Sequence, residues 1–182
     1  MNFWPVSYNY LALPLIRAVL HLASPFVAKL SQGLKGRRTS FPAIESFIAD
    51  HPGGQAAGGI LFHATSVGEY LQAAPLMQEI KRVDSSVPLY LSFFSPSVEK
   101  RATGCCHADL AFYLPEDTRT NMRRMIGLLA PRLIVVSKFD IWPNLVWVAA
   151  GEGVPVAVTA GTLSPDSGRV RGAAASFHRS FY

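Results

Sequence analysis

The residues best suited to chemistry lie together at positions 63–69, where the sequence reads His-Ala-Thr-Ser-Val-Gly-Glu. An apolar run at residues 59–62 precedes them and predicts a buried strand, and apolar residues at helical spacing follow from Val67 to Ile80. A strand, a tight turn and a helix therefore meet here, and ligands of open α/β sheets usually bind at such junctions. Glu69 is the candidate general base, because an apolar neighbourhood raises the pKa of a carboxylate and suits it to remove a proton from a hydroxyl.

Three further residues of this turn are predicted to bind a substrate. His63 provides an imidazole, Ser66 provides a hydroxyl that can also cap the following helix, and Gly68 lets a ligand approach the backbone closely. Each functional role has a structural alternative. Glu69 would stabilise the dipole of its own helix from the first turn, and His63 would be a core residue with its hydrogen bonds satisfied.

Polar residues also follow the other predicted strands, and in a parallel sheet all of these strand ends share one edge. The segments concerned are residues 92–97, 115–121, 138–144 and 159–164. Hydroxyls, positive charges and carboxylates along such a rim suit a site for a phosphate or a sugar. Lys138 has the alternative of pairing with Asp140. Substrate contacts are predicted for Ser95, Ser97, Lys138, Asp140 and Asn144.

Strands and helices alternate along the remainder of the chain. Apolar runs predict strands at residues 87–93, 110–114, 133–137 and 154–159, and helices are expected to begin near residues 95, 117 and 141. This alternation is typical of an α/β fold in which a Rossmann-like parallel sheet is flanked by helices. Before the first strand, the Gly- and Pro-containing residues 39–58 predict a linker or turn, with a short helix at residues 41–48.

The first 34 residues are the most apolar part of the chain. Pro14, Arg17, His21 and Pro25 interrupt them, so each apolar run has about half of the roughly 20 residues that span a membrane. Three interpretations stay open: an amphipathic helix lying in a membrane surface, a marginal transmembrane anchor, or a helix packed on the domain itself. Basic residues in and after this segment would contact an anionic lipid leaflet or form a solvated loop. They include Arg17, Lys35, Arg37 and Arg38.

The composition limits the class of protein. The chain has 182 residues, of which 49% are hydrophobic and 16% charged, so it can bury a sizeable core and is not a disordered chain. A net charge of +5 favours anionic partners. Cys105 and Cys106 are adjacent, which favours a reducing compartment over a disulfide framework, and no metal-ligand spacing is visible. The absence of a Gly-x-Ser-x-Gly elbow and of a P-loop argues against a small α/β hydrolase.

Five motifs follow one another along the chain. They are Gly36-Arg37-Arg38 after the apolar N-terminal segment, residues 63–69 followed by Ala-Pro-Leu at 74–76, residues 95–102, residues 113–121 and residues 138–145. Together they resemble the N-terminal domain of the 3-deoxy-D-manno-octulosonic acid (Kdo) transferases, and the resemblance covers nearly the whole chain.

The resemblance implies a two-domain glycosyltransferase of GT-B type, with two Rossmann-like halves that face each other across a cleft. Residues 1–38 would be a membrane-associating helix and connector. Residues 39–182 would be the half that binds the acceptor, a lipid A precursor, and the half that binds the donor, CMP-Kdo, is absent from this chain. Neither a cofactor nor a nucleic-acid partner is implied.

The same resemblance implies a mechanism and a location. Glu69 would be the catalytic base that deprotonates an acceptor hydroxyl for attack on the anomeric carbon of Kdo, with inversion and loss of CMP. The enzyme would work in lipopolysaccharide core biosynthesis at the cytoplasmic face of the bacterial inner membrane. Without a donor half, the chain alone is predicted to be inactive.

Two positions depart from the family pattern. Lys138 stands where many members have Glu, and Thr162 stands where the pattern has Arg, so the roles of those two residues are not carried over. The alternative to an enzyme is a non-catalytic module that kept the fold and binds a membrane or an anion.

Overall fold

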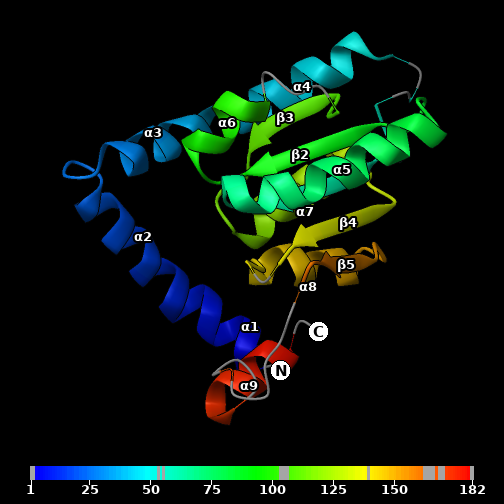
Figure 1. Ribbon diagram of the computed structural model, residues 1–182. Coiled ribbons are helices and arrows are strands. Elements are labelled where there is room, and N and C mark those ends of the chain that lie inside the picture. Colours follow the sequence, from blue (N-terminus) through cyan, green and yellow to red (C-terminus); the bar gives the residue numbers. More distant parts are fainter. Residues whose placement is uncertain are drawn as a thin grey trace.

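The computed structural model describes residues 3–52, 54, 56–102, 107–138, 140–161, 167 and 171–180 (Figure 1). At its centre is a five-stranded parallel sheet in the order β3-β2-β1-β4-β5. The strands are β1 (Ile60–Ala64), β2 (Leu89–Phe93), β3 (Leu110–Tyr113), β4 (Leu133–Ser137) and β5 (Val156–Thr159). Every residue of β1 and β2 is buried, as expected for parallel strands that are covered on both faces. The predicted α/β fold with a Rossmann-like parallel sheet is confirmed.

The order of the strands places a topological switch point between β1 and β4. The chain passes from β1 outward to β2 and β3, and then crosses back to pair β4 with the other side of β1. In open sheets of this kind, ligands bind beyond the carboxyl ends of the two strands that flank the switch point. The turn at residues 63–69 follows β1 and Lys138 follows β4, so both segments lie at this point.

Helices cover both faces of the sheet, and alternate residues of β1 point to opposite sides. Leu61 packs with α4 (Ser40–Asp50), α7 (Arg119–Leu129) and α8 (Pro143–Gly151) in one hydrophobic core. Phe62 packs with α5 (Val67–Val83) and α6 (Pro96–Ala102) in the other. The short helix predicted at residues 41–48 is confirmed and is longer than expected, because α4 covers residues 40–50 and the apolar side chain of Ile44 is fully buried in the core.

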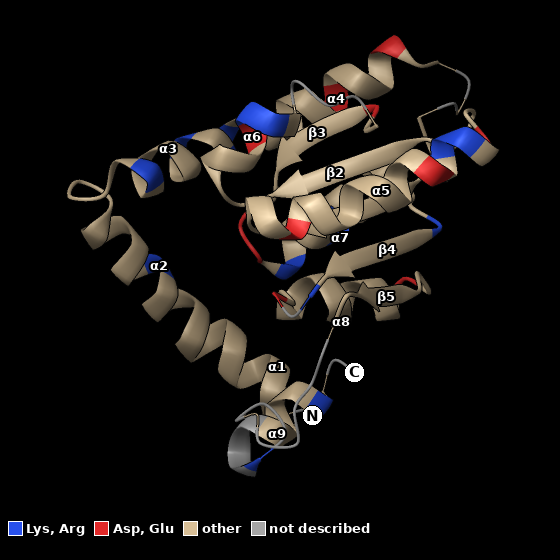
Figure 2. Cartoon of the chain, viewed as in Figure 1, with Lys and Arg blue, Asp and Glu red and all other residues tan. Residues whose placement is uncertain are grey.

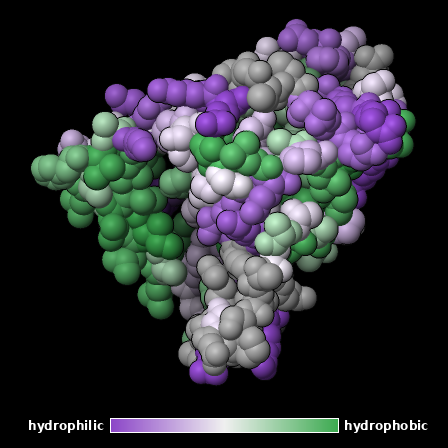
Figure 3. Space-filling model, viewed as in Figure 1, coloured by the Kyte–Doolittle hydropathy of each residue, from purple (hydrophilic) through white to green (hydrophobic). Residues whose placement is uncertain are grey.

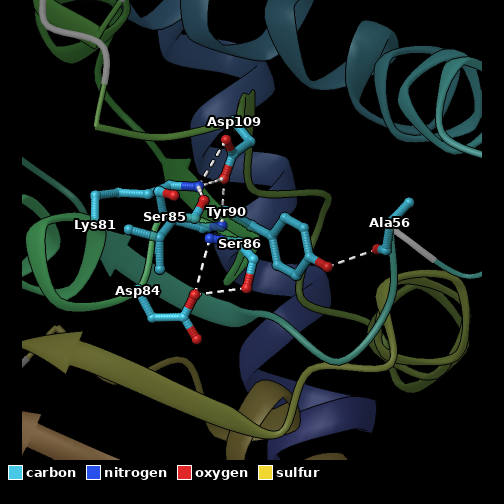
Figure 4. Close-up of polar contacts among 8 residues, drawn as sticks. Ala56, Lys81, Asp84, Ser85, Ser86, Tyr90 and Asp109 are labelled. Carbon is cyan, nitrogen blue, oxygen red and sulfur yellow. Dashed lines mark hydrogen bonds and ion pairs between the residues drawn. The ribbon is translucent and has the colours of Figure 1, made fainter.

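A polar network holds the amino-terminal edge of the sheet, away from the switch point (Figure 4). Oδ2 of Asp109 accepts a hydrogen bond of 2.7 Å from the backbone N–H of Leu89, and the same carboxylate pairs with Lys81 at 2.7 Å. The hydroxyl of Tyr90 donates to the carbonyl of Ala56 at 2.5 Å. These bonds tie the start of β2 to its neighbouring loops. The predicted substrate-binding residues lie at the opposite, carboxyl edge of the sheet.

An N-terminal arm of several helices precedes the domain, and a single apolar N-terminal helix is not supported. The arm consists of α1 (Phe3–Ser7), the π-helical turn η1 (Tyr8–Ala12), α2 (Leu13–Ala23) and α3 (Ala28–Gly36). Pro14 lies in the first turn of α2, where its missing N–H does no harm, whereas Pro25 falls in the turn that separates α2 from α3. Among the described residues, no helix is both long and apolar enough to cross a bilayer.

The arm begins with α1, which lies beside α9 (Gly172–Arg179), and it rejoins the domain through α3 (Figure 1). The indole N–H of Trp4 donates to Oγ of Ser176 at 3.0 Å, and its ring lies 5.4 Å from that of Phe177. Figure 3 shows apolar side chains gathered over α2, and Leu15, Val19 and Leu22 are all more than half exposed there. The first acidic residue of the chain is Glu45, and α1 to α3 carry only basic charges (Figure 2).

Candidate functional site

Glu69 lies in the first turn of α5, where it forms a capping box with Ser66. Oε2 of Glu69 accepts hydrogen bonds from the backbone N–H groups of Thr65 at 2.6 Å and Ser66 at 3.0 Å. In return, Oγ of Ser66 accepts one from the N–H of Glu69 at 3.4 Å. The residue is only 6% exposed. Glu69 thus stabilises the start of its own helix, as the structural alternative predicted. None of the described residues donates a hydrogen bond to its second oxygen, Oε1, which is left to accept a proton.

The surroundings of Glu69 make its carboxylate a better base than an ordinary one. Burial is the main cause that raises its pKa, and the negative charge of Asp140 raises it further. The N–H groups of Ser66 and Thr65 and the positive charge of Lys138 act in the opposite direction without cancelling the rise. Groups from the ends of β1 and β4 therefore act on one carboxylate at the switch point.

Lys138 has a strained backbone at the end of β4. Its φ of +61° lies in the left-handed region, which costs a residue with a Cβ about 1–2 kcal/mol. Its N–H still donates to the carbonyl of Thr159 at 2.8 Å, and Ala160, after β5, also has a positive φ of +53°. Strained residues of this kind cluster at binding and catalytic sites, which supports the assignment of this edge as the functional one.

His63 is a core residue, so the structure favours the second of its two interpretations. Its side chain is 1% exposed, with Nδ1 3.0 Å from Oγ of Ser92 and Nε2 3.3 Å from Oγ1 of Thr65. Burial lowers its pKa to about 4, so the imidazole is neutral at pH 7 and offers no positive charge to a substrate. Its role is to position the strand end from which Thr65 and Ser66 continue.

The small residues of the two neighbouring turns lie where they were predicted to. Ser66 and Gly68 are exposed, and a Cβ added to Gly68 would meet only Oγ of Ser66, at 4.0 Å. The N–H of Ser95 donates to the carbonyl of Thr65 at 3.2 Å, so the turns after β1 and β2 are held together. Oγ of Ser95 accepts a 3.3 Å bond from the N–H of Ser97. The space above Gly68 is therefore open to a ligand.

Asn144 was predicted to contact a substrate, but the geometry supports a structural role. It is fully buried, and its amide exchanges hydrogen bonds of 2.9 and 3.0 Å with the amide of Asn9. The same amide group also donates to the carbonyl of Asp117 at 2.5 Å. Because both ends of the amide are occupied within the protein, Asn144 ties η1 to the start of α8.

Asp117 is the residue that the sequence did not single out for this region. Its carboxylate accepts bonds from the backbone N–H groups of Asn144 at 3.1 Å and Leu145 at 3.0 Å, and so caps α8 from another part of the chain. Burial is the main cause that raises its pKa to about 6. The cap of its own neighbouring helix, α7, is Thr118, whose side chain accepts a hydrogen bond from the N–H of Asn121. A contact across 27 residues leaves no local pattern by which the second cap could be recognised.

The four basic residues that were predicted to meet a membrane or an anion line one cavity of about 560 Å³. Two elements of the arm, α2 and α3, form one side of it, and Pro115 and Glu116 form part of the other. Arg17 reaches across to Glu116, with Nε 2.6 Å from Oε1. Arg38 is exposed, whereas Arg37 is half-buried, so these adjacent residues differ in their surroundings. The four residues are Arg17, Lys35, Arg37 and Arg38.

In the described part of the chain, no group of three His, Cys, Asp or Glu side chains is close enough to hold a metal ion. Three residues discussed from the sequence, Cys105, Cys106 and Thr162, lie outside the described residues.

A parallel sheet in the order 3-2-1-4-5, with a buried carboxylate and a strained lysine at its switch point, defines this chain as a Rossmann-like domain with a site at the carboxyl edge. Comparison with known proteins narrows the class to the N-terminal domain of a glycosyltransferase. The family model for 3-deoxy-D-manno-octulosonic-acid transferase (kdotransferase) matches residues 33–182, and the chain belongs to this family.

Curated relatives agree with the family match. The 3-deoxy-D-manno-octulosonic acid transferase of Haemophilus influenzae is 30% identical over 111 residues, which is 60% of this chain and 26% of the relative. The enzyme of the same name from Bordetella pertussis is 29% identical over 128 residues, 64% of this chain and 28% of the relative. A probable mitochondrial 3-deoxy-D-manno-octulosonic acid transferase of Arabidopsis thaliana is 27% identical over 124 residues, which is 64% of this chain and 27% of the relative. The chain spans about a quarter of the length of these relatives.

Proposed function

We propose that this chain is the acceptor-binding half of a Kdo transferase, which transfers Kdo from CMP-Kdo to a lipid A precursor. The observation that carries the proposal is the state of Glu69: two backbone N–H groups fix one carboxylate oxygen, no described residue donates a hydrogen bond to the other, and burial raises the pKa. A base that is held rigidly and has a raised pKa suits proton removal from a sugar hydroxyl.

In the proposed reaction, Oε1 of Glu69 takes the proton of an acceptor hydroxyl. The hydroxyl oxygen then forms a bond to the anomeric carbon of Kdo, while the bond from that carbon to the phosphate of CMP breaks, so that configuration inverts. Gly68 directly precedes Glu69, and the open space beside it allows the acceptor sugar to approach this turn closely. Lys138 and Asp140 adjust the charge of the site, since both act on the pKa of Glu69.

CMP-Kdo would be bound by a second domain that faces this edge of the sheet, so we expect the chain by itself to transfer no sugar. The arm supports a location at a membrane surface, on the cytoplasmic face of the inner membrane, because its exposed apolar residues are accompanied by basic residues only. The same features favour the alternative, a non-catalytic module that binds membranes or anions.

The decisive experiment joins this chain to the donor-binding half of the Haemophilus influenzae relative and measures transfer of Kdo from CMP-Kdo to a lipid A precursor. Glu69→Gln is the informative variant, because glutamine can still accept the capping hydrogen bonds but cannot take a proton. We expect the rate to fall by about 10²- to 10⁴-fold. The matched control is Glu79→Gln, which changes an exposed glutamate of the same helix that pairs with Arg82. Equal rates for the two variants would exclude Glu69 as the base.

A further inference from the structure

The side chain of Arg37 has an unusual environment at the edge of the sheet. Its guanidinium carbon lies 4.3 Å from the centre of the Phe94 ring and 5.7 Å from that of Trp142, and these two rings stack on each other at 5.7 Å. Phe94 follows β2 and Trp142 precedes α8, so the stack bridges two of the loops at the carboxyl edge. Cation–π contacts fix the position of the guanidinium but satisfy none of its N–H donors.

Two donors in this stack lack a partner. Within the described part of the chain, neither Nη2 of Arg37 nor Nε1 of Trp142 has a hydrogen-bond acceptor, although both atoms are buried. No described carboxylate forms an ion pair with Arg37, although the more distant charges of Glu116 and Asp117 favour its charged form. Buried donors are almost always paired in folded proteins, so the buried and unpaired Nη2 of Arg37 points to an acceptor that binds from outside the chain.

The cavity beside Arg37 has the charge that such an acceptor requires. Arg17, Lys35, Arg37 and Arg38 line it, and Glu116 is the acidic residue among its described lining residues. Even after Arg17 has paired with Glu116, a strong positive excess is left. A volume of about 560 Å³ is suited to a sugar-sized ligand.

We propose that this cavity binds a phosphate monoester carried by a sugar, with Arg37 as its central contact. A phosphate monoester has nearly two negative charges at neutral pH and several acceptor oxygens, which match a planar guanidinium fork surrounded by further cations. The inference rests on the proposed function, because the phosphate would belong to the acceptor. It also separates Arg37, which holds the ligand, from the exposed Arg38, which is free to meet a lipid surface.

Isothermal titration calorimetry on the full chain tests the proposal with four probes. They are a glucosamine disaccharide that carries phosphate monoesters, the same disaccharide without phosphate, inorganic phosphate, and vesicles of phosphatidylglycerol. We expect the phosphorylated disaccharide to bind at least about tenfold more tightly than the unphosphorylated one, since a hydrogen bond to a charged group is worth about 1.5–3 kcal/mol. Equal affinities for the two disaccharides overturn the proposal without any variant.

Variants then locate the site. Arg37→Gln is expected to weaken binding of the phosphorylated disaccharide about 10- to 100-fold, and Arg37→Lys, which keeps the charge but loses the fork, to weaken it less. Lys35→Gln changes an exposed residue of the rim and should cause a several-fold loss even if Arg37→Gln fails to fold. The control is Arg123→Gln, whose arginine pairs with Glu152 away from the cavity. Unchanged affinity in both the Arg37→Lys and the Lys35→Gln variants would overturn the proposal.

The probes also separate the possible sources of the anion. If Arg37→Gln weakens vesicle binding alone, the cavity recognises a lipid headgroup and the sugar-phosphate proposal is wrong. Failure of this site and failure of the proposed function are distinguishable, because Glu69→Gln and its control Glu79→Gln both keep Arg37, so the ratio of their rates does not depend on phosphate binding at this cavity.

Discussion

The hydroxyl of Tyr8 donates a 2.9 Å hydrogen bond to Oδ2 of Asp117, a residue 109 positions further along the chain. This bond joins the N-terminal arm to the same carboxylate that caps α8 at the carboxyl edge of the sheet. The arm is therefore not an appendage that is independent of the domain. Its position relative to the site depends on a buried carboxylate whose pKa is raised.

The first prediction concerns two buried groups with opposite effects on stability. Asp117 has its pKa raised from 3.8 to about 6, so the folded protein binds more protons than the unfolded chain, and stability falls as the pH rises from about 4 to 6. His63 has its pKa lowered from 6.5 to about 4, so the unfolded chain binds more protons, and stability rises over nearly the same range. Each effect amounts to roughly 3 kcal/mol, so the two largely cancel in the wild-type protein.

Replacing the histidine would reveal the cancellation. We expect the free energy of unfolding of His63→Asn, measured by urea denaturation between pH 4 and pH 6.5, to fall by up to roughly 3 kcal/mol relative to the wild-type protein as the pH rises. The comparison with the wild type removes the contribution of all other groups. A variant whose pH dependence runs parallel to that of the wild type would show that folding does not lower the pKa of His63.

The open space above Gly68 gives a test of where the acceptor binds. A methyl group at this position meets no protein atom closer than 4.0 Å, and Ala is favoured over Gly in a helix by up to about 1 kcal/mol. Gly68→Ala should therefore keep or raise the melting temperature, while the transfer rate of the enzyme joined to a donor half falls if the acceptor approaches the backbone here. A variant with full activity would place the acceptor elsewhere.

Strain at Lys138 leads to a third prediction, for which the chain provides its own control. Lys138→Gly and Ala130→Gly both relieve a positive φ, of +61° and +41°, and each is expected to stabilise the fold by about 1 kcal/mol. Ala130 only caps the end of α7, so its replacement should leave transfer unchanged. Lys138→Gly should reduce transfer, because it removes a side chain that is proposed to contact the substrate at this edge of the sheet. Equal activity of the two variants would mean that the strain at Lys138 has no functional reason.

The apolar surface of the arm provides the fourth prediction. Leu15→Ser combined with Leu22→Ser should weaken co-sedimentation with anionic vesicles by more than about tenfold, because each leucine that enters the interface contributes roughly 2 kcal/mol. Leu71→Ser is the matched control, because Leu71 is also more than half exposed but lies on α5. If the control weakens binding as much as the double variant does, the arm is not the membrane-binding surface.

Much of the domain was predictable because its strands are local apolar runs. The predicted strands at residues 110–114 and 133–137 agree with the observed ones to within one residue, and the cluster at residues 63–69 lies between a strand and a helix as expected. These features depend on neighbours in the sequence. A buried strand must be apolar throughout, and a helix must begin with a group that accepts its first N–H bonds.

Features that depend on distant residues were not predictable. Arg37 and Arg38 are the same residue type at adjacent positions, and only the packing of α3 against the domain decides that the first is half-buried and the second exposed. Asn144 was predicted to contact a substrate at the sheet edge, because its hydrogen-bond partner Asn9 lies 135 residues away in the sequence. The arm is divided into separate helices at Pro25, which is visible in the sequence. Its position also depends on the contact of Tyr8 with Asp117, which no local pattern indicates.

The bond between Trp4 and Ser176 joins positions 172 residues apart. Because this bond and the contact between the rings of Trp4 and Phe177 hold α1 against α9, a displacement of the arm at a surface would also move the last described helix of the domain.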